Sequence, residues 1–361
     1  MRILKLIFAL LGLFFIVAIG VSYWLYSSLN SPKEHDKAEQ YIQIPKGSTP
    51  NQIIGKLASE GIISGQWPLL IYLRTFGNSQ NLQAGEYKFD SPITPLQVLK
   101  ELEKGENRMT KLTIPEGFTQ FDIAKRISEK FPQNPPMDEK AVLYLMNDTA
   151  QIRDFAPNAK NLEGYMYPST YEFSPETPPR EIIDRMVQQF KRIWKPEWNA
   201  RAAQLGRTPN EIVTIASLIE TESKFEEERP VVASVIYNRL KKNIPLGIDQ
   251  TAVYIAKMQN RWDGTIHKSD LEVNSPYNTR KFGGIPPGPI SSVSESAIKA
   301  ALNPAQTEYL FYVLNVEKND GSHNFYASAA EFEKGKAVYQ RWLEEQRAKK
   351  RSEQTPGSNQ P

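Results

Sequence analysis

The sequence predicts an α+β fold in three parts: an N-terminal transmembrane helix, a small α/β subdomain and a larger mixed α+β domain. Three observations support this. Residues 6–26 are uncharged and almost entirely apolar. Beyond them, short apolar runs typical of strands alternate with proline-initiated helix patterns. A length of 361 residues is also more than one ordinary domain needs.

The apolar run 6–26 has the flanks of a membrane anchor. Two basic residues, Arg2 and Lys5, precede it. It is long enough to cross a hydrocarbon core of about 30 Å as a helix. Its far end carries aromatic residues typical of a membrane interface: Tyr23, Trp24 and Tyr26. The basic flank predicts that residues 1–5 are cytoplasmic and that the rest lies outside. A cleaved signal peptide is the alternative, but the run is long and lacks a clear small-x-small site.

The remaining boundaries follow from composition. Residues 27–40 are polar and are predicted to form a linker. Residues 41–107 begin with a short strand, a Pro-x-Gly turn and a helix start, and form the small subdomain. Residues 108–343 form the larger domain. Residues 344–361 are charged and then rich in polar residues, which predicts a frayed helix running into a disordered tail.

A sequence pattern occurs twice, 70 residues apart. Ile44-Pro45-x-Gly47-x-Thr49 is matched by Ile114-Pro115-x-Gly117-x-Thr119. The repeat predicts two strand–turn–helix units, and two copies do not make a solenoid. The alternative is chance similarity between two capped strand–helix junctions.

Overall composition excludes several classes of function. A net charge of +3 gives no electrostatic signature of a nucleic-acid binder. The chain has no cysteine, so disulfides, thiolate metal sites and a cysteine nucleophile are excluded. Its three histidines do not lie at the spacing of helical metal ligands. There is also no Gly-x-Ser-x-Gly elbow and no phosphate-binding Gly-rich loop. We therefore expect no metal and no cofactor, and activity that survives a chelator.

The most informative helix pattern ends at Glu220. A capping box, Thr208 to Glu211 with proline between them, opens a helix that is apolar almost all round. Glu220 falls at its end, where desolvation raises the pKa of a carboxyl group. Such a group suits general acid catalysis on a glycosidic oxygen. The alternative is a structural glutamate paired with an arginine such as Arg239.

Further polar residues follow this helix. Glu222 is about 200° from Glu220 around the helix, so the two need not share an environment. Glu226–Glu228 form an acidic run, which predicts a solvated turn. A polar loop or short strand, 246–251, contains Asp249 as a second carboxylate. The Gly/Pro-rich segment 283–290 predicts a long rigid loop, either functional or a wall bracing the core.

Five motifs occur in the order found in the endolytic murein transglycosylase (YceG-like) family, which this sequence resembles from the anchor to about residue 342. They are Glu163-Gly164-Tyr165 with Pro168 and Thr170-Tyr171, then 216–223, 232–240, Tyr277-Asn278-Thr279 and 284–290. Two places depart from the family pattern. Segment 246–251 lacks the usual glutamine and proline, and Ser292-Val293-Ser294 replaces a usual Asn-Pro-Gly turn.

The resemblance implies a function and a set of site residues. It implies that Glu220 is the catalytic acid/base and that residues 41–107 form a LysM-like module, which binds glycan or supports the catalytic domain. It also implies a single-pass protein of the inner (cytoplasmic) membrane with a periplasmic catalytic domain, working on peptidoglycan and plausibly beside peptidoglycan synthases. Further candidate substrate-binding residues are Glu222, Asp249, Thr251, Tyr254, Tyr277, Asn278 and Thr279. For Tyr254 and Tyr277, a core role is the alternative to stacking on sugar rings.

The implied reaction is non-hydrolytic cleavage of MurNAc-β-1,4-GlcNAc bonds in nascent glycan strands. Glu220 protonates the leaving oxygen and then accepts the proton of the MurNAc 6-hydroxyl, which closes onto C1 as a 1,6-anhydro end. One carboxyl group suffices because the substrate supplies the nucleophile. The alternatives are a hydrolytic muramidase using Glu220 and Asp249, which needs two carboxylates at a defined separation, and a non-catalytic peptidoglycan-binding scaffold.

Overall fold

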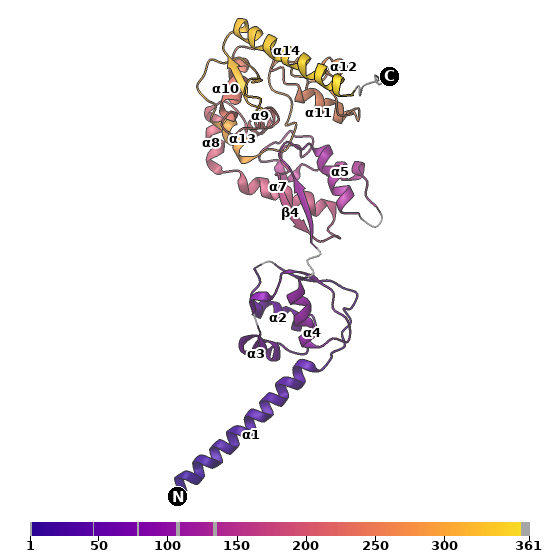
Figure 1. Cartoon of the computed structure of the whole chain (residues 1–361), viewed down its shortest axis with the longest axis vertical. Coiled ribbons are helices and arrows are strands. Elements are labelled where there is room, and N and C mark those ends of the chain that lie inside the picture. Colours follow the sequence, from indigo (N-terminus) through magenta and orange to yellow (C-terminus); the bar gives the residue numbers. More distant parts are fainter. Residues whose placement is uncertain (1, 46, 78, 106–108, 133–135, 355–361) are drawn as a thin grey trace, which may run out of the picture. The chain divides into compact units, whose positions relative to one another are not determined.

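The computed structural model describes residues 2–45, 47–77, 79–105, 109–132 and 136–354. Within these residues the fold is mixed α+β, as predicted, with the strands paired two by two as β1–β2, β3–β4 and β5–β6. The chain divides into two compact units, Met1–Thr110 and Lys111–Pro361 (Figure 1). Each unit has its own hydrophobic core.

The first unit begins with a long apolar helix, α1 (Arg2–Asn30). Its stretch Leu10–Asn30 is the one helix of the described residues that is long and apolar enough to cross a membrane. The last turns of α1 belong to the fold of the unit, because Leu29 is buried in the core and Leu25 packs against it. The linker predicted to start at residue 27 therefore starts later, since apolar side chains continue the helix to Asn30.

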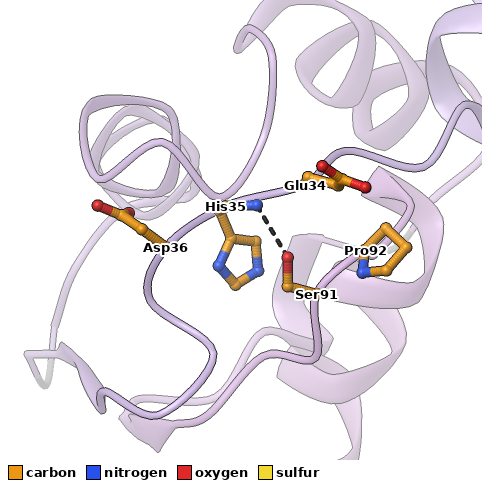
Figure 2. A pocket seen from close by; sticks show the side chains of 5 residues that line it. All are labelled: Glu34, His35, Asp36, Ser91 and Pro92. Atoms are coloured by element: carbon orange, nitrogen blue, oxygen red, sulfur yellow. Dashed lines mark hydrogen bonds between the residues drawn. The ribbon is translucent and has the colours of Figure 1, made fainter.

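The segment after α1 is attached to the first unit along its length. Lys33 and Ile93 form an antiparallel bridge with N···O distances of 2.9 and 3.0 Å. The backbone N–H of His35 donates to the hydroxyl of Ser91 at 2.9 Å (Figure 2). A shallow hollow here is lined by Glu34, His35, Asp36, Ser91 and Pro92. The predicted juxtamembrane linker 27–40 is thus held against the loop before α4, and its role as a linker stays a prediction.

A small antiparallel pair and three helices complete the first unit. The elements are β1 (Ile42–Ile44), α2 (Pro50–Ser59), α3 (Trp67–Thr75), a short 3-10 turn (Ser79–Asn81), β2 (Gly85–Tyr87) and α4 (Pro95–Lys104). Ile42 lies opposite Tyr87 in the β1–β2 pair. The core is mainly aliphatic, with Ile54, Leu57 and Leu102 fully buried. The LysM-like character of this unit stays a prediction.

The repeated pattern forms the same local structure twice, once in each unit. β1 leads through a turn into α2, and β3 (Thr110–Ile114) leads through a turn into α5 (Gln120–Lys130). Thr49 and Thr119 cap the two helices, each within a full capping box. Such a cap satisfies backbone N–H groups that the first helical turn leaves without partners. The predicted pair of strand–turn–helix units is thus confirmed.

The second unit is mainly helical. After β3 and α5 it comprises α6 (Glu139–Leu145), a 3-10 turn (Ala150–Ile152), β4 (Ser169–Phe173), α7 (Pro179–Ile193), α8 (Pro196–Gln204), α9 (Pro209–Glu222), α10 (Arg229–Lys241), α11 (Gln250–Met258), α12 (Lys268–Leu271), α13 (Glu295–Leu302), β5 (Phe311–Leu314), β6 (His323–Tyr326) and α14 (Ala329–Gln354). Helix α9 contacts α8, α10, α11 and α13 and forms the centre of the core.

One local prediction in this unit needs correction, and the helical part of another is confirmed. Segment 246–251 is not only loop or strand, because α11 begins at Gln250 directly after Asp249. Residues 344–354 continue α14, whose earlier turns pack on β5 and β6 and whose later turns are rich in strong helix formers. The remainder of the predicted tail, 355–361, lies outside the described residues.

Candidate active site

Helix α9 delivers Glu220 to the centre of the second unit. Thr208 and Glu211 form the predicted capping box, and the residues from Ile212 to Ile219 are all buried. The side chain of Glu220 is only 3% exposed. The predicted desolvation of this carboxyl group is confirmed.

Two donors bind the two oxygens of the Glu220 carboxyl group. Arg229 Nη2 donates to Oε1 at 2.7 Å, and the backbone N–H of Ser294 donates to Oε2 at 2.8 Å. Arg229 Nη1 also donates to the hydroxyl of Ser294 at 2.7 Å, which links the three residues. Ser294 is at the same time the N-cap of α13. Glu220 therefore faces a helix N-terminus, whose partial positive charge favours a carboxylate.

The loop before α13 holds Ser294 in this position. The Gly/Pro-rich segment 283–290 has neither helix nor strand, as predicted. At its end, Ile290 N–H donates to the hydroxyl of Ser217 on α9 at 3.0 Å. Ser292 N–H donates to the Phe118 carbonyl at 2.7 Å, in the turn between β3 and α5. Segment 283–290 thus braces the core and also positions Ser294 beside Glu220. The two predicted roles of this loop, functional and structural, are therefore compatible.

Gly164, in the Glu-Gly motif, packs directly against this loop. Its φ is +82°, and a Cβ here would lie 2.5 Å from Cβ of Pro289. Glycine is the residue that adopts this backbone conformation without a steric cost. Gly164 therefore packs against Pro289 of the loop so closely that a residue with a side chain would not fit at this position.

Burial dominates the protonation of Glu220. Desolvation raises the pKa of its carboxyl group, while the hydrogen bonds of Ser294 and the charge of Arg229 partly lower it. The charge of Glu116 raises the pKa further. Glu116 is 55% exposed and lies 3.6 Å from Arg229 Nη2. The site thus contains a shielded carboxyl group of raised pKa and an exposed carboxylate that share one guanidinium.

An arginine does pair with Glu220, but it is Arg229 and not the predicted Arg239. Arg239 donates instead to the carbonyl groups of Leu310 and Leu246 at 2.5 and 2.7 Å. Helical spacing could not identify Arg229, because the turn between α9 and α10 reverses the chain.

Glu222 lies in a separate environment, as its position on the helix predicts. Its Oε2 accepts a hydrogen bond of 2.6 Å from the hydroxyl of Tyr312 on β5. Burial raises the pKa of Glu222, and the charge of Asp249 adds to this effect. Nearby, Glu228 accepts hydrogen bonds from the backbone and ring of His323. The acidic run is therefore not a wholly solvated turn, since its last member is held by β6.

Asp249 is a surface carboxylate. It is paired with Arg280, whose Nε lies 2.7 Å from Oδ1, and its side chain is 47% exposed. Its charge acts on Glu222, whereas Glu116 is the carboxylate whose charge acts on Glu220. The structure therefore brings Glu116, rather than Asp249, to the predicted acid.

Three of the candidate substrate contacts are interior residues. Thr251, Asn278 and Thr279 are at most 1% exposed. Thr251 and Thr279 bind each other and the backbone of Ile248, while Asn278 donates to carbonyl groups of the preceding turn. These buried side chains hold the loop before α11 and the loop after α12, and their contact with glycan stays a prediction.

The two tyrosines differ from each other. Tyr254 is 2% exposed and accepts a hydrogen bond from the Gln120 side chain, so it has the core role that was the alternative. Tyr277 packs on it at 5.1 Å between ring centroids and is partly exposed. Beneath them, Glu163 is buried and accepts the backbone N–H of Gln120 at 2.9 Å. Desolvation raises the pKa of Glu163 to about 8.

Sequence reasoning missed the residues closest to Glu220. Arg229 follows an acidic run and directly precedes a proline, a context typical of a turn. Glu116 lies in the second copy of the repeated turn. Ser294 was noted only as a departure from a usual turn. A serine followed three residues later by the apolar pattern of a helix is a capping signal, and it would have placed α13.

A shielded carboxyl group of raised pKa, with an arginine and a second carboxylate beside it, is the kind of arrangement that enzymes use for acid–base chemistry. Residues 42–338 match the model of the YceG-like family, and the chain belongs to this family. Relatives support the same class of enzyme, since they carry the name endolytic murein transglycosylase.

One relative, from Bacillus subtilis (strain 168), is 32% identical over 89% of this chain and 91% of its own length. Another, from Streptococcus pneumoniae serotype 2, is 28% identical over 76% of this chain. The aligned part spans about half of that longer streptococcal protein, 54%. Among solved structures, a YceG-like protein from Listeria monocytogenes has a TM-score of 0.54 and 30% identity. That match covers 81% of this chain and 97% of the Listeria chain.

Proposed function

We propose that this chain is an endolytic lytic transglycosylase that cleaves MurNAc-β-1,4-GlcNAc bonds in nascent peptidoglycan strands and leaves 1,6-anhydro-MurNAc ends. The observation that carries the proposal is the shielded carboxyl group of Glu220, whose pKa is raised by burial while Arg229 and Ser294 bind its oxygens. The relatives named endolytic murein transglycosylase support the same substrate.

Glu220 serves first as acid and then as base. In its protonated form it has less need of a cationic partner, and Arg229 can then turn its charge toward Glu116, 3.6 Å away. After the proton passes to the leaving oxygen, the carboxylate is again stabilised by Arg229 and by the N–H of Ser294. That carboxylate accepts the proton of the MurNAc 6-hydroxyl as this oxygen bonds to C1. The proton count balances, and no water is consumed.

A hydrolytic muramidase remains the second candidate, with Glu116 in place of Asp249. Hydrolysis needs a second carboxylate, about 5–5.5 Å away in retaining and about 6.5–9.5 Å away in inverting enzymes. Asp249 is engaged by Arg280 and acts on Glu222. Glu116 is exposed and shares Arg229 with Glu220, so it is the group that could activate water.

The proposal includes a single-pass anchor in the cytoplasmic membrane, with the N-terminus inside and the second unit outside. The supporting observation is that Leu25 and Leu29 of α1 pack into the first unit. Removal of α1 as a signal peptide would strip apolar side chains from that core. An anchored position would also place the enzyme beside peptidoglycan synthases, and the first unit would be a LysM-like support.

The products of digestion test the proposal. Purified glycan strands are treated with the full chain in water enriched in ¹⁸O, and the new ends are analysed by mass spectrometry. We expect 1,6-anhydro-MurNAc ends without ¹⁸O. Reducing ends that carry ¹⁸O would establish the muramidase instead, and binding without any new ends would establish a non-catalytic scaffold.

A further inference from the structure

Helix α3 of the first unit exposes large apolar side chains that have no role in its core. Leu69, Leu70 and Leu73 of this helix are buried. Trp67 and Phe76, the latter at the C-cap, are 62% and 76% exposed, and Ile71 is exposed as well. Beyond α1, the described part of this unit exposes one other large apolar side chain, Tyr41. We call Trp67, Ile71 and Phe76 the α3 surface.

The α3 surface adjoins the end of the apolar helix α1. Helices α1 and α3 are in direct contact, and α3 lies at the end of the unit where α1 enters it (Figure 1). Phe76 lines a hollow together with Asn30, the last residue of α1. The predicted span 6–26 ends about one helical turn before Asn30, so a bilayer crossed by it ends close to this surface.

The connection between α1 and α3 leaves little freedom. Leu29 is buried in the core that Leu70 and Leu73 also line. Directly after α1, the Lys33–Ile93 bridge fixes the chain to the loop before α4. Because the span and the unit share one core, the unit has no spacer with which to leave the membrane.

We propose that the α3 surface docks the first unit onto the outer surface of the lipid bilayer. This inference rests on the proposed membrane anchor. The residue types fit this occupant, since tryptophan and phenylalanine partition into the interface and exposed apolar patches mark membrane contact. Ile71 lies one helical turn from Trp67 on the same side of α3, and the exposed Arg74 lies one turn further, where it can meet lipid phosphates. Phe76 follows the last turn of α3, on the side of the hollow that Asn30 also lines.

A glycan strand is the competing occupant, because exposed aromatic rings also stack on sugars. The bilayer is favoured by position: the span ends at the same hollow that Phe76 lines. Ile71 also offers a sugar ring no face for stacking, but it adds apolar area that lipid can cover.

Nitroxide labels on single cysteines can test the docking, since the chain has no cysteine of its own. Four variants of the full chain, Trp67→Cys, Phe76→Cys, Asn51→Cys and Ile16→Cys, are labelled and reconstituted into nanodiscs of phosphatidylethanolamine and phosphatidylglycerol. Paramagnetic resonance then compares the collision of each label with oxygen, which concentrates in lipid, and with a water-soluble nickel complex. Asn51 is an exposed residue in the first turn of α2 and serves as the matched control.

We expect labels at 67 and 76 to collide severalfold more with oxygen relative to nickel than the label at 51, and less than the label at 16. If 67 and 76 match 51 while 16 is in lipid, the anchor stands and the docking is overturned. If 16 is also in water, the anchor and the docking both fail. Protection of 67 and 76 by added N-acetylglucosamine oligomers, after water accessibility in the nanodisc, would assign the surface to glycan instead.

Discussion

Arg229 Nη2 lies 2.7 Å from Oε1 of Glu220, and the two side chains are only 5% and 3% exposed. An ion pair this shielded is costly to break, because removing one partner leaves an uncompensated buried charge. When Glu220 is protonated, the buried guanidinium of Arg229 still needs a counter-charge, and Glu116 supplies one 3.6 Å from Nη2. The pair can therefore hold either protonation state of Glu220, as acid–base catalysis requires.

Glu220→Gln should lower the rate of glycan cleavage about 10²–10⁴-fold or more, since general acid–base catalysis contributes about that much. The amide keeps an acceptor for the N–H of Ser294 but cannot exchange a proton with the substrate. Anhydro ends counted by mass spectrometry give the rate. Glu226→Gln, at an exposed position of the neighbouring acidic run, is the control and should retain activity. Undiminished product from Glu220→Gln would refute its assignment.

Glu116→Gln should move the alkaline side of the pH–activity profile to lower pH. The charge of Glu116 raises the pKa of Glu220, so removing that charge lowers this pKa. Glu220 then loses its acidic proton at a lower pH. The measurement is kcat/KM on glycan oligomers across the pH range. Glu129→Gln, exposed on α5, should leave the profile in place. Complete loss of activity in Glu116→Gln would instead favour a muramidase that needs this carboxylate.

Glu163→Gln should make the stability of the chain less dependent on pH between about 4.5 and 8. The pKa of Glu163 is about 8 in the folded chain, against 4.5 for an ordinary glutamate, so the folded chain keeps this proton up to a higher pH than the unfolded chain does. The stability that protonated Glu163 contributes is complete below about pH 4.5. It decreases as the pH rises from there and is lost once the pH has passed about 8. Each tenfold difference in proton affinity corresponds to about 1.4 kcal/mol. Thermal unfolding at several pH values should show this decline in the native chain and in Glu181→Gln, but not in Glu163→Gln.

Gly164→Ala should destabilise the chain more than Gly206→Ala. Both glycines have positive φ, +82° and +67°, so alanine costs about 1–2 kcal/mol of backbone strain at either. Only at Gly164 does the new Cβ also collide, 2.5 Å from Pro289, which adds about 1–3 kcal/mol. Denaturant unfolding measures both costs. Activity should fall in Gly164→Ala alone, because the displaced loop carries Ser294. Equal costs would mean that the loop yields without resistance.

Local structure was predictable where short-range signals determine it. The capping box at Thr208 places the start of α9, and the apolar run places Glu220 at its buried end. The repeated Ile-Pro-x-Gly-x-Thr pattern likewise produced two strand–turn–helix units. In these cases the interactions join residues only a few positions apart, so spacing carries the information.

The contacts that complete the site could not be read from spacing. Ser294 meets Glu220 across 74 residues, and Glu116 approaches through a different element again. Burial of Thr251 and Asn278 depends on how α11 and α12 pack, which local sequence does not encode. The attachment of the predicted linker could not be read from spacing for the same reason, because the Lys33–Ile93 bridge joins segments 60 residues apart.

If α1 is the membrane anchor proposed above, the core that it shares with the first unit keeps that unit close to the lipid. A flexible tether would instead let the chain reach glycan strands far from the membrane. Under the proposed anchor, a span that shares a core with the first unit would keep the chain near polymer close to the membrane. Nascent strands, the proposed substrate, would be the polymer within that reach. A preference of the enzyme for nascent strands would then come from its distance to the membrane, and the enzyme would not need to recognise a chemical difference between nascent and mature strands.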